Sequence, residues 1–188
     1  MAQRQAAATD APPPPKDGLA YRPCVGILLL DAEGRAFTGR RIATEAGVLP
    51  PQRWQLPQGG IDAGEAPRAA AFRELKEEVG TGAAELLGEY PGWLTYDFPD
   101  WVLAHSRSRG YRGQTQRWFA MRFLGRPEEI DLAAHEPPEF DAFLFRPLAE
   151  LPGLVVPFKR PVYEAVTAHF APLAEALAHG RLATGARA

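Results

Sequence analysis

The chain has 188 residues, of which 46% are hydrophobic and 10% aromatic, enough to bury the core of one domain. Its formal net charge of −2 excludes a protein that coats nucleic acid by bulk positive charge, so any such contact needs a local basic patch. No apolar run approaches the ~18 residues of a membrane span and the N-terminus lacks the apolar core of a signal peptide, so we expect a cytoplasmic protein.

The two ends of the chain differ in composition from the middle. Residues 1–19 contain a proline run and small polar residues, which bury too little surface to offset the entropy of ordering, so we predict a disordered tail. We place the domain at residues 20–172 and expect residues 173–188 to form the end of the last helix and a loose tail. The one cysteine, Cys24, cannot form an intramolecular disulfide, and its apolar neighbours predict a small buried side chain.

Short strands and helices alternate between the tails. Apolar or alternating runs predict strands at 24–30, 36–41, 92–98, 115–124 and 139–146, with Gly- and Pro-rich or polar loops at 51–65 and 105–113. A helix is predicted from Pro67, which suits a first turn, to Val79, with Gly80 at its end. A second helix is predicted over 158–177, bent or broken near Pro172. This order predicts an α/β fold with a mixed sheet covered by helices.

The helix predicted over 67–79 carries an unusual charge pattern. A rotation of roughly 100° per residue places Glu74, Glu77 and Glu78 on one face about 100° wide. Leu75 and Val79 then point toward the core. Two carboxylates ~6 Å apart repel by about 3 kcal/mol at an effective dielectric near ~20. A hard divalent cation such as Mg²⁺ would relieve that repulsion, although a simply solvated acidic face would show the same residues.

The glycine-rich loop before this helix favours the metal site. Five residues separate Gly59 from Glu65, and seven more separate Glu65 from the run RELKEEVG, residues 73–80. This pattern resembles the box of the Nudix hydrolase family: Gly, five residues, Glu, seven residues, then Arg-Glu-apolar-any-Glu-Glu-any-Gly-apolar. The matching positions are Gly59, Glu65, Arg73, Glu74, Leu75, Glu77, Glu78 and Gly80. Thr81 stands where an apolar residue is usual, which we expect to affect packing and not chemistry.

The resemblance implies an α/β/α sandwich around a mixed β-sheet, and hydrolysis of a phosphoanhydride bond in a nucleoside diphosphate linked to another moiety. It also implies a divalent cation, Mg²⁺ or Mn²⁺, which neutralises charge on the phosphates and activates a water. By position, the implied metal ligands are Glu74, Glu77, Glu78 and Gly59. Glu65 and Arg73 are implied to hold the loop against the helix, which ends at Gly80.

Segments outside the box resemble one branch of the family, the bacterial RNA pyrophosphohydrolases and the related dinucleoside polyphosphate hydrolases. These segments are YRPCVGILL, WQLPQGGID, GQTQRWFAMRF, PEFDAF and VVPFKRPVY, which together span residues 21 to about 170. The branch implies removal of pyrophosphate from the 5′-triphosphate end of RNA, which leaves a 5′-monophosphate and initiates RNA decay. The alternative is hydrolysis of diadenosine polyphosphates. A regulator that binds a nucleotide without hydrolysing it is disfavoured by the intact glutamates.

The branch also implies site residues outside the box. Glu139 matches a further carboxylate that reaches the metal, and either Glu78 or Glu139 can serve as the proton acceptor. Phe158 would stack on a base and Lys159 would bind a base edge or a phosphate, with a hydrophobic staple and a surface lysine as the alternative. Arg22 and Arg41 can bind a phosphate or be surface arginines. The residues Gln114, Gln116 and Arg117 match the motif of the branch and are further candidates for substrate binding. Arg107, Arg109 and Arg112 can bind phosphate or be solvated loop charges, and Trp54 can bind a ligand or pack.

Overall fold

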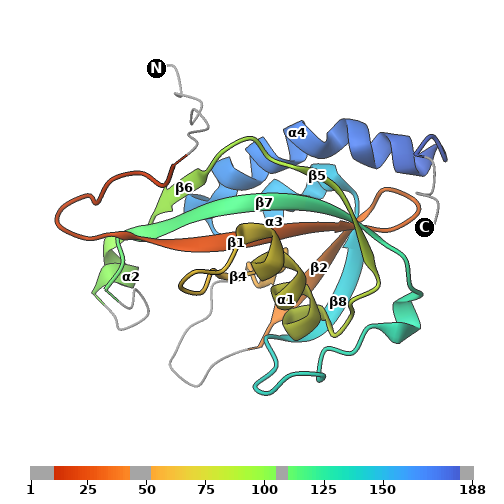
Figure 1. Ribbon diagram of the computed structural model, residues 1–188, viewed down its shortest axis with the longest axis horizontal. Helices are drawn as coiled ribbons and strands as arrows, with labels where there is room; N and C mark the ends of the chain where they lie inside the picture. Colours follow the sequence, from red (N-terminus) through yellow and green to blue (C-terminus); the bar gives the residue numbers. More distant parts are fainter. Residues whose placement is uncertain (1–10, 43–51, 105–109, 183–188) are drawn as a thin grey trace.

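A computed structural model describes residues 11–42, 52–104 and 110–182 of the chain (Figure 1). Its centre is an 8-stranded mixed sheet. The strands are β1 (Tyr21–Leu30), β2 (Ala36–Arg41), β3 (Trp54–Gln55), β4 (Gln58–Gly60), β5 (Ala84–Glu89), β6 (Leu94–Asp97), β7 (Gly113–Phe123) and β8 (Phe140–Arg146). The order β3-β2-β1-β7-β5 forms the main path, with β4 paired to β1, β6 to β7 and β8 to β2. The β1–β7 pair is parallel and the other pairs are antiparallel.

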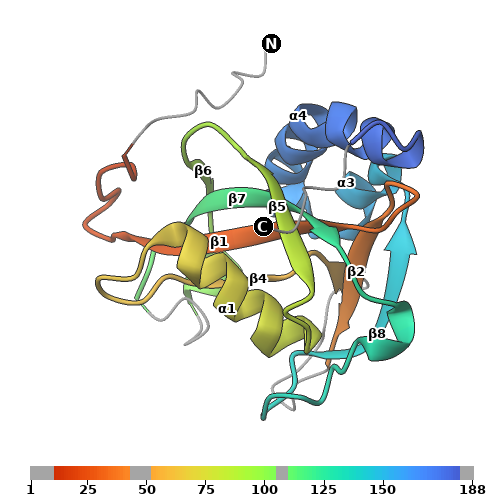
Figure 2. The same cartoon turned by 45° about the vertical axis from the view of Figure 1, so that its right-hand side comes forward.

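Helices cover both faces of this sheet (Figures 1 and 2). The helix α1 (Pro67–Val79) lies on one face, and α3 (Leu151–Leu154) and α4 (Arg160–Ala178) lie on the other. A short helix α2 (Asp100–Leu103) follows β6, and 3₁₀ turns η2 (Pro127–Glu129), η3 (Leu148–Glu150) and η4 (Pro157–Lys159) complete the described elements. The predicted α/β/α sandwich with a mixed sheet is therefore confirmed.

The central strands are buried on both faces because their side chains alternate between two cores. In β7, Trp118 and Ala120 pack in the core beneath α4, whereas Phe119 and Met121 pack in the core beneath α1. The apolar run of β1 divides in the same way. The sheet thus places α1 and the α3–α4 layer at fixed positions on opposite sides.

The first predicted helix has the predicted bounds, and Gly80 adopts a left-handed conformation at its end (φ 70°). The second prediction was wrong about a break at Pro172, because α4 continues through this residue. Its buried face runs on both sides of the proline, from Val162 to Leu177, and this packing holds the helix together. The predicted loop at 51–65 contains β3 and β4, and β5 was not predicted at all.

A turn precedes β1, in which Lys16 and Leu19 exchange backbone hydrogen bonds of 2.9 and 3.0 Å. Lys16 Nζ also contacts the carboxylate of Asp97 at 2.6 Å. This turn lies within the segment predicted to be disordered, and the division into domain and tails stays a prediction. Cys24 is 1% exposed, which confirms its predicted burial. In the described ranges, no helix combines the length and apolarity that a membrane crossing requires.

Candidate active site

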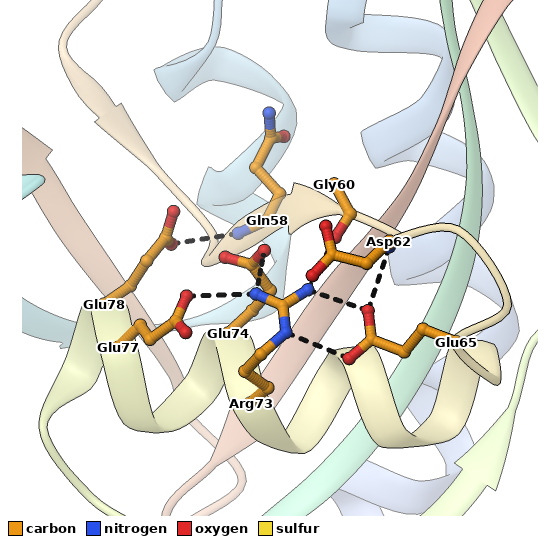
Figure 3. Close-up of polar contacts among 8 residues, drawn as sticks. All are labelled: Gln58, Gly60, Asp62, Glu65, Arg73, Glu74, Glu77 and Glu78. Carbon is orange, nitrogen blue, oxygen red and sulfur yellow. Dashed lines mark hydrogen bonds and ion pairs between the residues drawn. The ribbon is translucent and has the colours of Figure 1, made fainter.

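Arg73 lies at the centre of the hydrogen bonds that join the glycine-rich loop to α1 (Figure 3). Its Nε and NH2 donate to the two carboxylate oxygens of Glu65, both at 2.9 Å, and NH2 also donates to the Gly60 carbonyl at 2.8 Å. Its NH1 donates to Oε1 of Glu74 at 2.8 Å and to Oε2 of Glu77 at 3.0 Å. One guanidinium therefore ties the loop to the helix and pairs with three carboxylates, those of Glu65, Glu74 and Glu77.

The carboxylate of Glu65 is stabilised in its charged form. The hydrogen bonds from Arg73, together with the Asp62 amide at 3.0 Å, lower the pKa of Glu65 to about 2. The same pairing raises the pKa of Arg73. Glu65 and Arg73 thus form a charge-assisted pair that stays ionised at neutral pH.

Glu74 and Glu78 are buried carboxylates, with 8% and 6% of their surface exposed. Oε2 of Glu78 accepts the backbone amide of Gln58 at 3.0 Å (Figure 3). Burial raises the pKa of Glu78 well above its usual value, and the negative charges of Glu139 and Glu74 raise it further. Burial also raises the pKa of Glu74. The site therefore concentrates carboxylates that are costly to keep charged without a nearby cation.

Two glycines make room for charged side chains beside α1. A side chain at Gly59 would overlap the carboxylate of Glu74, and one at Gly60 would overlap the guanidinium of Arg22. Both glycines lie in β4, which pairs with β1 through Cys24 and Val25. The GG sequence thus lets the strand, the helix and an arginine approach each other closely.

Within residues 11–42, 52–104 and 110–182, no three Asp, Glu, His or Cys side chains are arranged to enclose a metal ion. The contacts above explain this, because Glu74 and Glu77 point to Arg73 while Glu139 pairs with Arg41 at 2.9 Å. The donor chemistry still suits a divalent cation. Carboxylate oxygens are its preferred ligands, and among the described residues the buried Glu78 has a backbone amide but no side-chain cation bonded to it.

A cavity of about 560 Å³ opens beside these carboxylates. Its lining includes nine of the residues predicted from the sequence: Gly59, Glu74, Glu78, Glu139, Arg22, Arg41, Gln114, Phe158 and Lys159. They come from β1, β2, β4, α1, β7, η4 and the approach to β8. Acidic groups, cations and an aromatic ring thus meet in one space.

Glu77, Gln116 and Arg117 are predicted site residues that do not line the cavity. Glu77 lies outside it and contacts Arg73. Gln116 is 1% exposed and is used internally, because its Nε2 donates to Gln114 at 3.0 Å and its Oε1 accepts Trp118 Nε1 at 3.0 Å.

Arg117 follows Gln116 in β7, so its side chain leaves the opposite face of the strand. It pairs with Glu89, and its guanidinium lies 5.9 Å from the ring of Trp93. The structure therefore does not bring Arg117 to the cavity, and the prediction of a substrate contact finds no support in its position.

Lys159 lines the cavity and is half-buried. Its Nζ donates to Gln55 Oε1 at 3.4 Å and lies 5.9 Å from the ring of Tyr96. Burial lowers the pKa of Lys159 to about 8, and the positive charge of Arg41 lowers it as well. The ammonium is therefore charged at neutral pH but has few partners, which suits an anionic ligand.

The sequence reasoning missed most of the cavity's aromatic wall, which we define as Tyr96, Phe98, Trp101 and Phe158. Ring centroids of Phe158 lie 5.6, 6.5 and 6.3 Å from those of Tyr96, Phe98 and Trp101. All four line the cavity. The segment YDFPDW, residues 96–101, carried the signal, but its first three residues were interpreted only as the end of a strand and 99–101 had no prediction.

The remaining predicted residues serve other contacts. Arg112 donates to Asp97 at 3.1 Å and does not line the cavity, and Arg107 and Arg109 lie outside the described residues. Trp54 lines the cavity and also packs, with the Arg146 guanidinium 5.0 Å from its ring centroid. Thr81 is 7% exposed, and its hydroxyl accepts the Ala83 amide at 3.1 Å, which satisfies the buried oxygen.

Comparisons with known proteins agree with this geometry. The family profile described as the NUDIX domain matches residues 20–166. A protein of Caulobacter vibrioides named RNA pyrophosphohydrolase is 53% identical over 151 residues, which is 80% of this chain and 86% of that protein. A protein of Acidiphilium cryptum with the same name is 51% identical over 157 residues, covering 84% and 94%.

Solved structures show the same fold at low sequence identity. The E. coli dihydroneopterin triphosphate pyrophosphohydrolase has a TM-score of 0.59 at 20% identity, covering 79% of this chain and 98% of that one. A C. elegans Ap4A hydrolase complex has a TM-score of 0.55 at 16% identity, covering 80% and 98%.

Proposed function

The chain belongs to the Nudix family of hydrolases, and from this premise we propose that it is an RNA pyrophosphohydrolase. It would remove pyrophosphate from the 5′-triphosphate end of RNA, leave a 5′-monophosphate and so initiate RNA decay. The names of relatives at about 50% identity over most of the chain support this substrate. Such a substrate places the reaction in the cytoplasm.

One observation carries the proposal: the buried carboxylates of α1 and the aromatic wall line the same cavity. A triphosphate needs cationic partners, and an RNA end offers bases that stack on aromatic rings. Arg22 and Lys159 line the same cavity and would bind the phosphates, while Gln114 would add a hydrogen bond. Phe158 would stack on a base near the RNA end.

We propose that Glu74, Glu77 and Glu78, together with Gly59 and Glu139, would hold a divalent cation, Mg²⁺ or Mn²⁺. When bound, the cation would offset charge on the phosphates and activate a water. Glu74 and Glu77 would have to turn away from Arg73, and Glu139 from Arg41, because these contacts occupy their oxygens. Glu65 would keep Arg73 in place during that change through its two hydrogen bonds.

Glu78 is our candidate for the group that takes the proton from the attacking water. A general base works best when its pKa lies near the pH of the reaction, and burial raises the pKa of Glu78 in that direction. Glu139 is the less suitable candidate, because its side chain is 45% exposed and pairs with Arg41.

The experiment that tests the proposal compares substrates with the wild-type protein and Mg²⁺ or Mn²⁺. We expect 5′-triphosphorylated RNA to release pyrophosphate and yield 5′-monophosphorylated RNA faster than diadenosine tetraphosphate is cleaved. Faster cleavage of the dinucleotide would favour the alternative, a diadenosine polyphosphate hydrolase. Cleavage of neither would contradict both activities.

A further inference from the structure

Trp101 is an exposed aromatic side chain at the mouth of the cavity. It belongs to α2 and lines the cavity beside Phe158, yet 52% of its surface is exposed. Among the described residues, the other exposed large apolar side chains are Leu124 (56%) and Leu144 (47%), and neither lines the cavity. An indole offers one of the largest stacking surfaces in proteins, so its exposure at a substrate cavity indicates a contact surface.

The backbone that carries Trp101 is held firmly. The neighbouring Val102 is only 7% exposed and packs toward the cavity, and its amide donates to Pro99 at 2.8 Å. Just before α2, the Phe98 amide donates to the Arg112 carbonyl at 2.9 Å. The preceding Asp97 accepts the Tyr21 hydroxyl at 2.6 Å. The backbone that carries the Trp101 ring is therefore held in place before a ligand binds, which lowers the entropy cost of binding to the ring.

The angle between Trp101 and Phe158 decides what the indole can contact. Their ring centroids lie 6.3 Å apart and their planes meet at 66°. A base that stacks flat on Phe158 cannot also lie flat on Trp101, because stacking needs nearly parallel planes. The two rings thus offer stacking surfaces for two different bases, and Trp101 is the more exposed of the pair.

We propose that Trp101 stacks on the base that follows the one on Phe158, so that the enzyme binds the RNA end over one more nucleotide. The inference rests on the proposed RNA pyrophosphohydrolase activity and adds a residue that favours longer RNA ends. A single-stranded end can splay successive bases, as two surfaces at 66° require. Loss of one stacking contact between a base and an aromatic side chain weakens binding by roughly 5- to 150-fold.

The test measures KM for 5′-triphosphorylated oligonucleotides of increasing length, from a single nucleotide upward, with the wild type, Trp101→Ala and Phe158→Ala. We expect Phe158→Ala to raise KM only for RNAs that reach a certain length. Trp101→Ala should raise KM by about tenfold, and only for RNAs that are at least one nucleotide longer than that. Trp101→Phe should restore most of the affinity, and Trp101→Leu should not, because only the first keeps a ring that can stack. Leu124→Ala is the matched control for loss of an exposed apolar side chain outside the cavity.

The outcomes separate this inference from the proposed function. If the wild type releases pyrophosphate from these RNAs but both defects begin at the same length, Trp101 supports the base on Phe158 and the inference is wrong. A Trp101→Ala variant with unchanged KM at every length overturns it as well. If the wild type cleaves no triphosphorylated RNA, the proposed function itself fails, which is visible before any variant is made.

Discussion

The Arg73 guanidinium and the Glu65 carboxylate form a two-pronged ion pair, with both N–O distances at 2.9 Å. The pair joins the loop after β4 to the middle of α1, so it fixes where the acidic face of the helix meets the glycines. Neither residue lines the cavity, which agrees with the structural role that the motif implies for them. Its strength can be measured through its pH dependence.

Replacing Glu65 with Gln should lower the free energy of unfolding at pH 7. The pKa of Glu65 is about 2 in the folded protein and lies near its ordinary value of 4.5 in the unfolded chain. The unfolded state therefore binds more protons between these values, so the contribution of Glu65 is complete above pH 4.5 and is lost as pH falls toward 2. Urea unfolding of both proteins from pH 7 downward should show the difference shrinking, and a constant difference would contradict the assignment.

Replacing Glu78 with Gln should remove most activity without lowering stability. A missing general base typically costs about 10²–10⁴-fold in rate. At pH 7 the buried carboxylate with its raised pKa favours unfolding, so a neutral amide of the same shape should leave the unfolding temperature unchanged or higher. Turnover of triphosphorylated RNA and thermal unfolding measure the two effects. The exposed Glu128→Gln is the control, and near-normal turnover of the Glu78 variant would contradict its role.

Replacing Gly59 with Ala should destabilise the protein, because the added methyl group overlaps the Glu74 carboxylate. Overpacking of this kind costs about 1–3 kcal/mol. Gly82→Ala is the matched control, since no atom lies within 4 Å of the position of its added methyl group. Chemical denaturation should separate the two variants. Equal stability of both would mean that Glu74 moves away without cost.

The sequence predicted α1 well because its signals are local. Pro67 fits the first turn, and Gly80 takes the left-handed conformation that ends the helix. β5, in contrast, contains Ala, Glu and Gly, which have weak strand preferences, and it forms because β7 offers a pairing edge from Ala84 to Glu89. The strand β5 therefore depends on its pairing with β7, and the local sequence pattern does not encode this contact.

The residues of the candidate site also fall into those that the local sequence places and those that only the folded chain brings together. The motif placed Glu74 and Glu78 correctly beside the cavity, since helical geometry alone sets their common face. The motif could not show that Arg117 leaves the opposite face of β7, because that depends on the register of the strand. Nor could it show the aromatic wall, in which Phe158 meets rings from residues 96–101 only after the chain folds.

The value of kcat/KM for triphosphorylated RNA should fall as pH rises through about 8. Lys159 loses its charge there in the free protein, since burial lowers its pKa to about 8, and a neutral amine binds phosphate less well. At pH 7 the group is protonated, so the effect is absent. Lys159→Arg keeps a positive charge at all these pH values and should flatten the profile. A wild-type profile that stays level to pH 9 would show that Lys159 does not bind the phosphates.

The folded protein should bind Mn²⁺, and the binding should tighten as pH rises. The cation must compete with protons for Glu78 and Glu74, whose pKa values burial raises, so metal uptake releases protons. Electron paramagnetic resonance counts the free Mn²⁺ directly and does not depend on turnover.

We expect Glu78→Gln to weaken Mn²⁺ binding at least about tenfold, because it removes one of a small set of charged oxygen ligands. The exposed Glu128→Gln should bind like the wild type. If the wild type takes up no Mn²⁺ at any pH, even with a non-cleavable nucleotide present, the carboxylates of α1 do not form a metal site, and pairing with Arg73 would be the main role of Glu74 and Glu77.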